Sequence, residues 1–390
     1  MTQLDPIFIN ELQNIDKILK NEIIKNILDG TGTNYKTDHY LSIYNFVSKY
    51  GNKDIEASHL YEYFNNTLKE TFEELSKNLK DKQNNEIIDL FIDFAKKIDI
   101  IILFMYKTFS YLEFYYVRNF NKEKILKCAL EIYKKYIFLP IQKQVTDEVN
   151  KLLKEDRLGK KEYRQKIKKI LSIMKTMDLS SPAIFKNEKK EEVWIEKDSE
   201  KKKTSIQKYW FDLFMKDTEE FLIAKIKEDL QKNSIPEFIK IQLKFLEEEK
   251  ERQKEVINEI FIKELNELIY KKIIEDNMKE IIEKESGLKD MLKNNKNEEL
   301  TNLYELFKLH EPSLKELAKI FVEYVENRGK LLSESEEIKA KPESYPQRLN
   351  ELQKEINSIV ENCFKNNEII LSAVKVKFGE LMNPGENNSK

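Results

Sequence analysis

Apolar residues recur along most of the chain at the spacing of one face of an α-helix. In segment 5–28, for example, Phe8, Leu12, Ile15, Leu19 and Ile23 keep this period. The same spacing predicts further helices at 35–50, about 60–79, 86–118 (one or two helices), 122–138, 141–157, 160–178, 206–232, 237 to about 256, from there to 285, 298–309, 314–329 and 349–363. No pair of alternating strands is apparent, so the pattern predicts an all-α chain.

Segment 35–50 is apolar around most of its circumference. Its regular stripe at i, i+3, i+4 and i+7 consists of Tyr40, Ile43, Tyr44 and Val47. Leu41 and Phe46 lie on either side of that stripe. One core needs only one apolar stripe, so a second apolar face requires a second neighbour. That neighbour is either another helix of the same bundle, which composition favours, or a protein partner.

Segment 179–205 breaks the helical pattern. Residues 186–203 are mostly Lys, Glu and Asp around the apolar triplet 193–195. This composition predicts one long mobile loop, with Trp194 packed onto the helices. The apolar run within 86–118 is interrupted by Asp99, Lys107 and Glu113, and a membrane span needs about 20 apolar residues. We therefore expect buried helices there and no membrane segment.

The composition is typical of long helices, and the positive and negative residues of the chain nearly balance. The 390 residues include only 8 Gly and 8 Pro, which suits long helices joined by short loops. Lys and Arg (68) nearly balance Asp and Glu (70), so no net field attracts nucleic acid or an anionic membrane. The two cysteines, Cys128 and Cys363, are expected to be reduced thiols, and no secretory signal is apparent. We expect an intracellular protein of the cytoplasm or nucleus.

No motif predicts a reaction centre, a cofactor site or a metal site. The three histidines, His39, His59 and His310, have no zinc-ligand spacing, and no Cys-x-x-Cys pair occurs. The nucleophile elbow, the Walker A motif and the dinucleotide-binding fingerprint are also absent. The residues therefore predict a protein that is not an enzyme and that holds no cofactor.

Several segments resemble the N-terminal half of cullins, the scaffolds of multisubunit ubiquitin ligases. The most specific is 138–146, FLPIQKQVT, and segment 40–50, YLSIYNFVSKY, resembles the YxxLYxxVY helix of that family. Further matches follow in the same order over residues 4–383: Tyr111, Leu112, Val117, Arg118, Leu152, Leu153, Arg157, Gly159, Thr218, Phe221, 247–252, Glu299, Leu300, Tyr304, Lys341, Pro342, Tyr345, Leu349, Cys363, Phe364, Asn366 and Asn367. Each match is a helix-core pattern, so the evidence is their shared order.

The resemblance implies three consecutive five-helix bundles, called cullin repeats, forming an elongated curved rod. The repeats would span residues 1–125, 126–235 with a charged loop at about 180–205, and 236–383, followed by a disordered tail at 384–390. The second and fifth helices of the first repeat would bind an adaptor protein that carries a substrate receptor. The residues implied to face the adaptor are Tyr40, Ile43, Tyr44, Val47, Tyr111, Phe114 and Arg118.

The N-terminal residues look most like the SCF-type cullin, which implies a Skp-type adaptor with an F-box receptor. A BTB-fold adaptor stays open, because Glu113 and Phe114 stand where the family usually has Asn and Arg. Nothing resembles the half of cullins that holds the RING subunit, so a RING partner is expected only if such a half exists. The alternative from another class is a helical-rod vesicle-tethering subunit, which has a similar composition.

Overall fold

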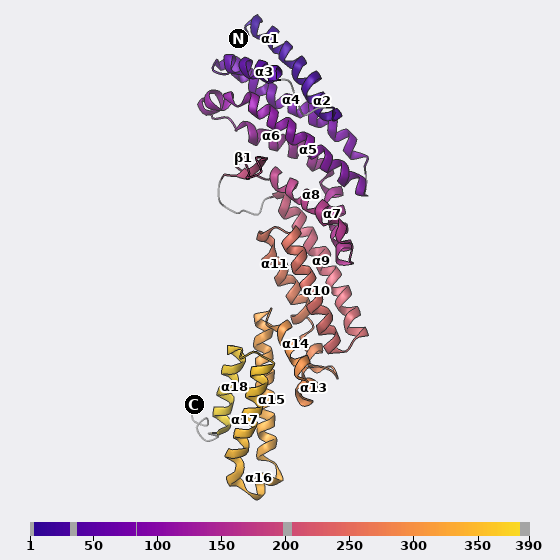
Figure 1. The fold of residues 1–390 in the computed structure, drawn as a ribbon, viewed down its shortest axis with the longest axis vertical. Coiled ribbons are helices and arrows are strands. Elements are labelled where there is room, and N and C mark those ends of the chain that lie inside the picture. Colours follow the sequence, from indigo (N-terminus) through magenta and orange to yellow (C-terminus); the bar gives the residue numbers. More distant parts are fainter. Residues whose placement is uncertain (1–3, 32–36, 83, 198–204, 383–390) are drawn as a thin grey trace. The chain divides into compact units, whose positions relative to one another are not determined.

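The computed structural model describes residues 4–31, 37–82, 84–197 and 205–382. Most of these residues are helical, which confirms the predicted all-α class (Figure 1). None of the described helices combines the length and the apolar character that crossing a membrane requires. The chain divides into two compact units, residues 1–213 and 214–390, with the boundary inside one helix, α9 (Ser205–Lys232). The three-repeat division remains a prediction.

The first unit contains a series of helices, some of which include π or 3-10 turns (η). In order they are α1 (Pro6–Lys17), η1 (Ile18–Ile24), α2 (Lys25–Asp29), α3 (Thr37–Tyr50), α4 (Asp54–Lys80), α5 (Asn84–Phe109), η2 (Glu113–Val117), α6 (Ile125–Tyr133), η3 (Lys134–Phe138), η4 (Leu139–Ile141), α7 (Gln142–Arg157), η5 (Lys161–Tyr163) and α8 (Arg164–Met177). Two short strands, β1 (Pro182–Lys186) and β2 (Glu192–Glu196), come between α8 and α9.

The second unit continues from α9 with helices alone among its described residues. They are α10 (Ile235–Val256), α11 (Glu259–Tyr270), η6 (Lys271–Glu275), α12 (Met278–Glu283), α13 (Leu288–Lys293), α14 (Asn297–Phe307), α15 (Glu311–Ser333), α16 (Glu336–Ala340), η7 (Pro342–Ser344), α17 (Tyr345–Asn362) and α18 (Glu368–Met382). The closest packing joins α15 to α18 and α10 to α14.

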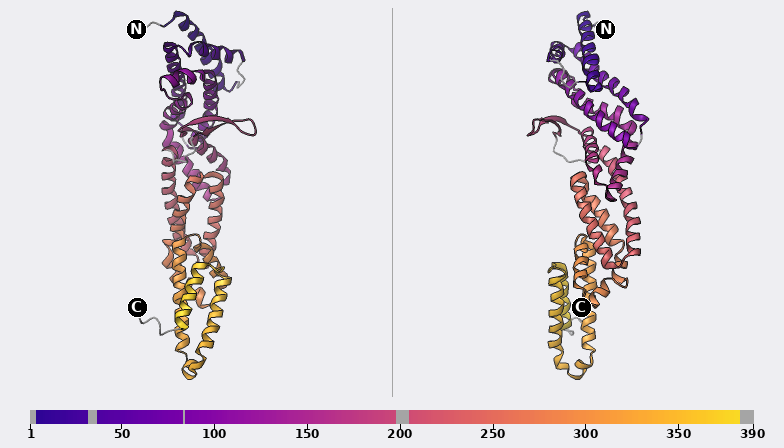
Figure 2. Two further views of the ribbon diagram at one scale, coloured as in Figure 1. Left: turned by 90° about the vertical axis from the view of Figure 1, so that its left-hand side faces the viewer. Right: turned by 45° about the vertical axis from the view of Figure 1, so that its right-hand side comes forward.

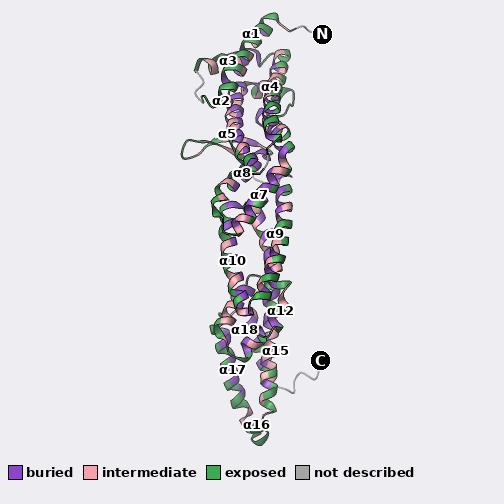
Figure 3. Cartoon of the chain, turned by 90° about the vertical axis from the view of Figure 1, so that its right-hand side faces the viewer, coloured by how far each residue is buried: buried purple, intermediate pink, exposed green. Residues whose placement is uncertain are grey.

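Helix α5 lies at the centre of the first unit. It packs against α2, α3, α4, α6, α7 and α8. Its apolar residues therefore cover most of its circumference rather than one stripe, and Ile98, Ile102 and Met105 have no exposed surface. Figure 3 shows buried residues along the inner faces of the helices and exposed residues on the outer faces.

The predicted long loop at 179–205 is wrong for residues 182–196, which form a β-hairpin. The strands are antiparallel, and Ile184 pairs with Trp194. A turn stabilises the tip, where Asn187 N–H donates to the Glu191 carbonyl at 2.9 Å. At the base, Glu196 accepts hydrogen bonds from the backbone N–H groups of Ser180 and Ser181, both at 2.7 Å. These hydrogen bonds could not be predicted from the charge-rich sequence of the segment. Residues 198–204 lie outside the described residues.

Two further differences concern helix ends in the second unit. The sequence predicted a helix that begins at 237, after Pro236, whereas α10 begins at Ile235 and Pro236 lies in its first turn, where a proline costs no hydrogen bond. Ser234 and Glu237 form a capping box there, which fixes the start of α10. Helix α18 was not predicted, because its apolar residues lie on more than one face. The predicted disordered tail at 384–390 lies outside the described residues.

We expect Gly287→Ala to destabilise the second unit. A Cβ at residue 287 would lie 2.5 Å from the Ile281 carbonyl oxygen and 2.8 Å from that of Ile282. Backbone atoms of this kind cannot move aside cheaply, and overpacking typically costs about 1–3 kcal/mol. Urea denaturation followed by circular dichroism measures the free energy of unfolding.

Gly379→Ala is the matched control in the same unit. Gly379 lies within α18, and a Cβ there would meet no atom within 4 Å. This substitution should leave the stability unchanged or raise it by up to about 1 kcal/mol, because Ala is the better helix former. Equal stability of the two variants would contradict the proposed crowding at Gly287.

Candidate functional site

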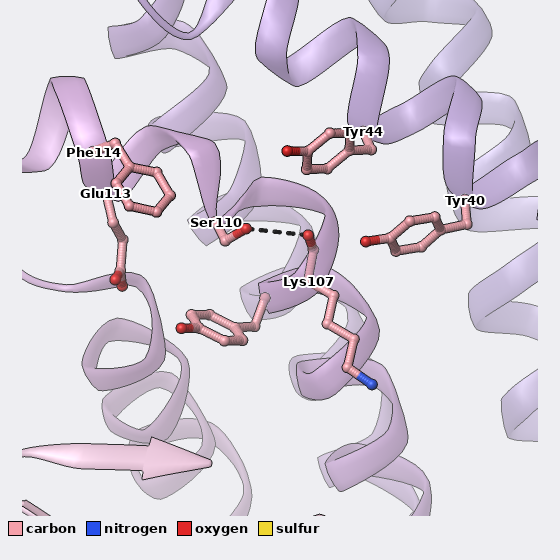
Figure 4. Close-up of a pocket in the computed structure, with 7 residues that line it drawn as sticks. Tyr40, Tyr44, Lys107, Ser110, Glu113 and Phe114 are labelled. Carbon is pink, nitrogen blue, oxygen red and sulfur yellow. Dashed lines mark hydrogen bonds between the residues drawn. The ribbon is translucent and has the colours of Figure 1, made fainter. Parts of the chain in front are cut away.

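A groove of about 530 Å³ opens beside α3 and the C-terminal end of α5 (Figure 4). It lies within the first unit. Its seven lining residues come from α3, from α5 and from the segment that follows α5: Tyr40, Tyr44, Tyr106, Lys107, Ser110, Glu113 and Phe114. Three of the residues predicted to face an adaptor, Tyr40, Tyr44 and Phe114, are thus brought together. Four of the seven side chains are aromatic.

The α3 wall of the groove consists of two stacked tyrosines. The rings of Tyr40 and Tyr44 are nearly parallel, with centroids 6.1 Å apart, and the Tyr40 ring also meets Phe104 edge-on at 6.3 Å. Both tyrosines are half-buried, so each presents one side to the groove. Ile43 and Val47, predicted to face the adaptor with them, are fully buried, at 0% exposure. These two residues belong to the core, where α3 packs against α1, α4 and α5.

Tyr111 and Arg118, also predicted to face the adaptor, lie outside the lining of the groove. Tyr111 is half-buried next to Gly51, the residue that follows α3. A Cβ at residue 51 would lie 2.9 Å from Cδ1 of Tyr111, so glycine allows this ring to approach the end of α3. Arg118 is exposed at the end of the segment. Tyr111 therefore packs at the C-terminal end of α3 and does not line the groove.

The opposite wall is the π-turn segment η2, which displays Phe114. The two residues that follow Phe114 fix the turn to α4: Tyr115 Oη donates to Asp54 at 3.1 Å, and Tyr116 Oη donates to Ser58 Oγ at 3.0 Å. Phe114 is 77% exposed, although it is a large apolar residue. Ser110 Oγ donates to the Lys107 carbonyl at 3.2 Å and closes the turn between α5 and η2. The hydrogen-bonded turn η2 thus keeps the Phe114 ring exposed to solvent.

Both charged residues of the groove have partners within the chain. Lys107 Nζ lies 2.7 Å from a carboxylate oxygen of Glu192 on strand β2. Glu113 Oε1 accepts a hydrogen bond from the backbone N–H of Ile125 at 3.0 Å, at the start of α6. Burial raises the pKa of Glu113, while the Ile125 N–H and the ammonium groups of Lys124 and Lys197 oppose that rise. The surface that remains free for a ligand is aromatic and hydroxyl-bearing.

Sequence reasoning missed Tyr106, Lys107, Ser110 and Glu113 as groove residues. Tyr106, Ser110 and Glu113 stand at i, i+4 and i+7, the spacing of one helical stripe. Applied to the residues that follow the apolar run of α5, this spacing could have found them. The pairing of Lys107 with Glu192 could not have been found, because it joins residues 85 positions apart.

The two cysteines of the chain lie outside the groove. Cys128 and Cys363 are free thiols, and burial raises the pKa of each, which disfavours the nucleophilic thiolate. Across the described residues, no group of three or more His, Cys, Asp and Glu side chains could hold a metal ion.

A second hollow of about 610 Å³ lies beside α4 and α6, with Asn65, Cys128 and Tyr136 in its wall.

The hairpin is attached to α5 by a second polar contact besides Lys107–Glu192. The indole of Trp194 donates a hydrogen bond to the carboxylate of Asp99 on α5. Trp194 is half-buried, as expected for a side chain packed onto the helices. Burial raises the pKa of Asp99 from 3.8 to about 7, and the bond from Trp194 only partly offsets the rise.

Comparison with known proteins identifies one family over nearly the whole chain. The family described as the cullin alpha solenoid domain matches residues 16–390. The chain is similar to cullin-1 of Oryza sativa subsp. japonica, with 21% identity over 94% of this chain and 49% of the relative. It is also similar to cullin-4A of Mus musculus, with 23% identity over 74% of this chain and 33% of the relative. The chain thus spans at most about half the length of these relatives.

The raised pKa of Asp99 predicts a pH-dependent stability that Asp99→Asn should remove. Between pH of about 4 and about 7 the folded protein keeps a proton at Asp99 that the unfolded chain has lost. The stabilisation linked to that proton therefore falls as the pH rises through this window and is constant above it. Asparagine stays neutral throughout and can still accept the Trp194 hydrogen bond.

The measurement is the melting temperature of both proteins between pH 4 and pH 8. The melting temperature of the variant should rise relative to that of the wild type as the pH rises to about 7. Above that pH the difference between the two melting temperatures should stay constant. Other carboxylates titrate equally in both proteins, so they cancel in the difference. A difference that does not change with pH would show that Asp99 is ionised in the folded state.

Proposed function

Because the chain belongs to the cullin family, we propose that it is a scaffold segment of a ubiquitin ligase. In this function it has no catalytic activity of its own. It binds a substrate adaptor at the groove of α3, α5 and η2, and so holds a substrate near the conjugating machinery. Such a scaffold accelerates transfer by proximity and orientation. It would act inside the cell, in the cytoplasm or nucleus.

The observation that carries the proposal is the exposed aromatic surface of the groove. Tyr40, Tyr44 and Phe114 offer large, stiff contact areas, and such residues dominate binding energy at protein interfaces. Lys107 and Glu113 are paired internally, so the partner need not supply a matching charge. Recognition then rests on apolar burial and on hydrogen bonds to tyrosine hydroxyls.

The proposed adaptor is a Skp-type protein that carries an F-box receptor, with a BTB-fold adaptor as the second candidate. The resemblance of the N-terminal residues to the SCF-type cullin supports the first. The BTB-fold adaptor remains a candidate because Phe114 stands where the family usually has Arg. An apolar ring at this position would bind an apolar pocket of the adaptor. Family membership favours either adaptor over the vesicle-tethering alternative.

We expect the double variant Tyr40→Ala, Tyr44→Ala to lose adaptor binding. Each anchor of this kind typically contributes about 2 kcal/mol or more, so Kd should rise by at least about thirtyfold. Isothermal titration against a panel of Skp-type and BTB-fold adaptors provides the measurement. Little dependence of Kd on salt is expected, because the groove charges are already paired.

Tyr209→Ala is the control, since Tyr209 is also exposed, at 41%, but lies on α9. It should bind the adaptor like the wild type. Melting temperatures separate loss of contact from loss of fold, because both groove tyrosines also stack within the chain. If the double variant binds normally, the groove is not the adaptor site.

A competition assay tests the scaffold function itself. In a ubiquitination reaction reconstituted with a full-length cullin and its RING subunit, an excess of this chain should reduce substrate modification, because it occupies the adaptor. The Tyr40→Ala, Tyr44→Ala variant should not reduce it. Conjugation driven by this chain without any full-length cullin would overturn the proposal of a non-catalytic scaffold.

A further inference from the structure

The hairpin has two chemically different faces. Residues directly opposite in an antiparallel pair share a face, so Ile184, Trp194 and Glu192 lie on one face. That face carries the contacts of Trp194 with Asp99 and of Glu192 with Lys107, so it points to the helices. The other face is entirely apolar and consists of Ala183, Phe185, Val193 and Ile195.

Two of the four residues of this apolar face are exposed, and Ala183 and Val193 are half-buried. Phe185 is 59% exposed and Ile195 is 38% exposed. In both views of Figure 2 the hairpin stands out from the helices of the first unit. A small two-stranded sheet would normally carry polar residues on a solvent face. A contiguous exposed apolar patch is therefore a feature that needs a partner.

The hairpin is continuous with the groove. The Glu192 carboxylate that begins β2 pairs with Lys107, one of the groove-lining residues. Just after β2, the ammonium of Lys197 favours the ionised form of Glu113, another lining residue. A strand of the hairpin is visible below the groove in Figure 4. The hairpin is thus attached to Lys107, and the residue that follows β2 lies close enough to Glu113 for its charge to act on it.

The groove alone is small for a protein interface. It is lined by seven residues, whereas a stable interface uses about 20–30 residues on each side. A protein seated on Tyr40, Tyr44 and Phe114 must therefore extend over neighbouring surface. The hairpin provides adjacent surface with the apolar character that interface cores prefer.

We propose that the outward face of the hairpin, Ala183, Phe185, Val193 and Ile195, is a second docking surface for the adaptor bound at the groove. This inference rests on the proposed function of the groove. The occupant is the adaptor itself rather than the receptor it carries, because the hairpin borders the groove directly. The adaptor would present an apolar patch to Phe185 and Ile195. Glu192 and Trp194 act as positioning residues that hold the face in place.

The test is the double variant Phe185→Thr, Ile195→Thr, titrated with the adaptor alone. Threonine keeps the strand propensity and leaves the inner face unchanged, so the hairpin should stay folded. We expect Kd to rise by about tenfold, because one large and one medium apolar side chain lose their burial. Leu158→Thr is the control, since Leu158 is 70% exposed but directly follows α7, away from the hairpin strands in the sequence. It should bind like the wild type.

A photo-crosslink gives a second, independent readout. Phe185 is replaced by the similarly shaped p-benzoylphenylalanine, and the complex with adaptor and receptor is irradiated. An adduct with the adaptor supports the inference. An adduct with the receptor alone, or no adduct while the complex forms, overturns it.

The outcomes separate this inference from the proposed function. If the wild type binds an adaptor and only the groove tyrosines matter, the groove function stands and the hairpin surface is wrong. If the wild type binds no adaptor, the proposed function itself fails. If the hairpin variant weakens binding only when the receptor is present, the hairpin serves the receptor, and the proposal is overturned.

Discussion

The burial of helix α5 is the constraint on which the first unit depends. It contacts α2, α3, α4, α6, α7 and α8, so six neighbours must fit around one helix. Apolar burial of this extent is the dominant favourable term in folding. Several polar side chains nevertheless lie on α5. Asp99 and Lys107 are two of them, and both are used to hold the hairpin. The groove lies beside the C-terminal end of α5.

Helical periodicity predicted the architecture well because it reports burial directly. Most of the helices of both units were found in this way, and the all-α class followed. The hairpin was missed because its inner face is held by contacts with α5, which no local pattern reveals. Its alternation covers only five residues in each strand, within a run of charged residues. Helix α18 was missed because apolar residues on several faces obscure a single stripe.

The candidate site was predicted in part, and the reason is geometric. Periodicity placed Tyr40, Ile43, Tyr44 and Val47 on one stripe, but it could not say which half of the stripe the neighbouring helices cover. The structure buries Ile43 and Val47 and leaves the two tyrosines at the edge. Phe114 was brought to the same groove by η2, a turn whose position depends on hydrogen bonds to α4. Adaptor binding itself stays a prediction for all of these residues.

The turn at the tip of the hairpin is closed by bonds within the hairpin, and this affects which insertions the chain can tolerate. The turn at Asn187–Glu191 is closed by its own hydrogen bonds, and the base is clamped by Glu196 and by Lys197 N–H bonded to the Ser181 carbonyl at 3.0 Å. Extra residues inserted at the tip would alter neither α8 nor α9. Descendants of this sequence could therefore acquire longer tips, and thus new specificities, by simple insertion. For the same reason, the tip is a suitable position at which to insert a fluorescent reporter close to the groove.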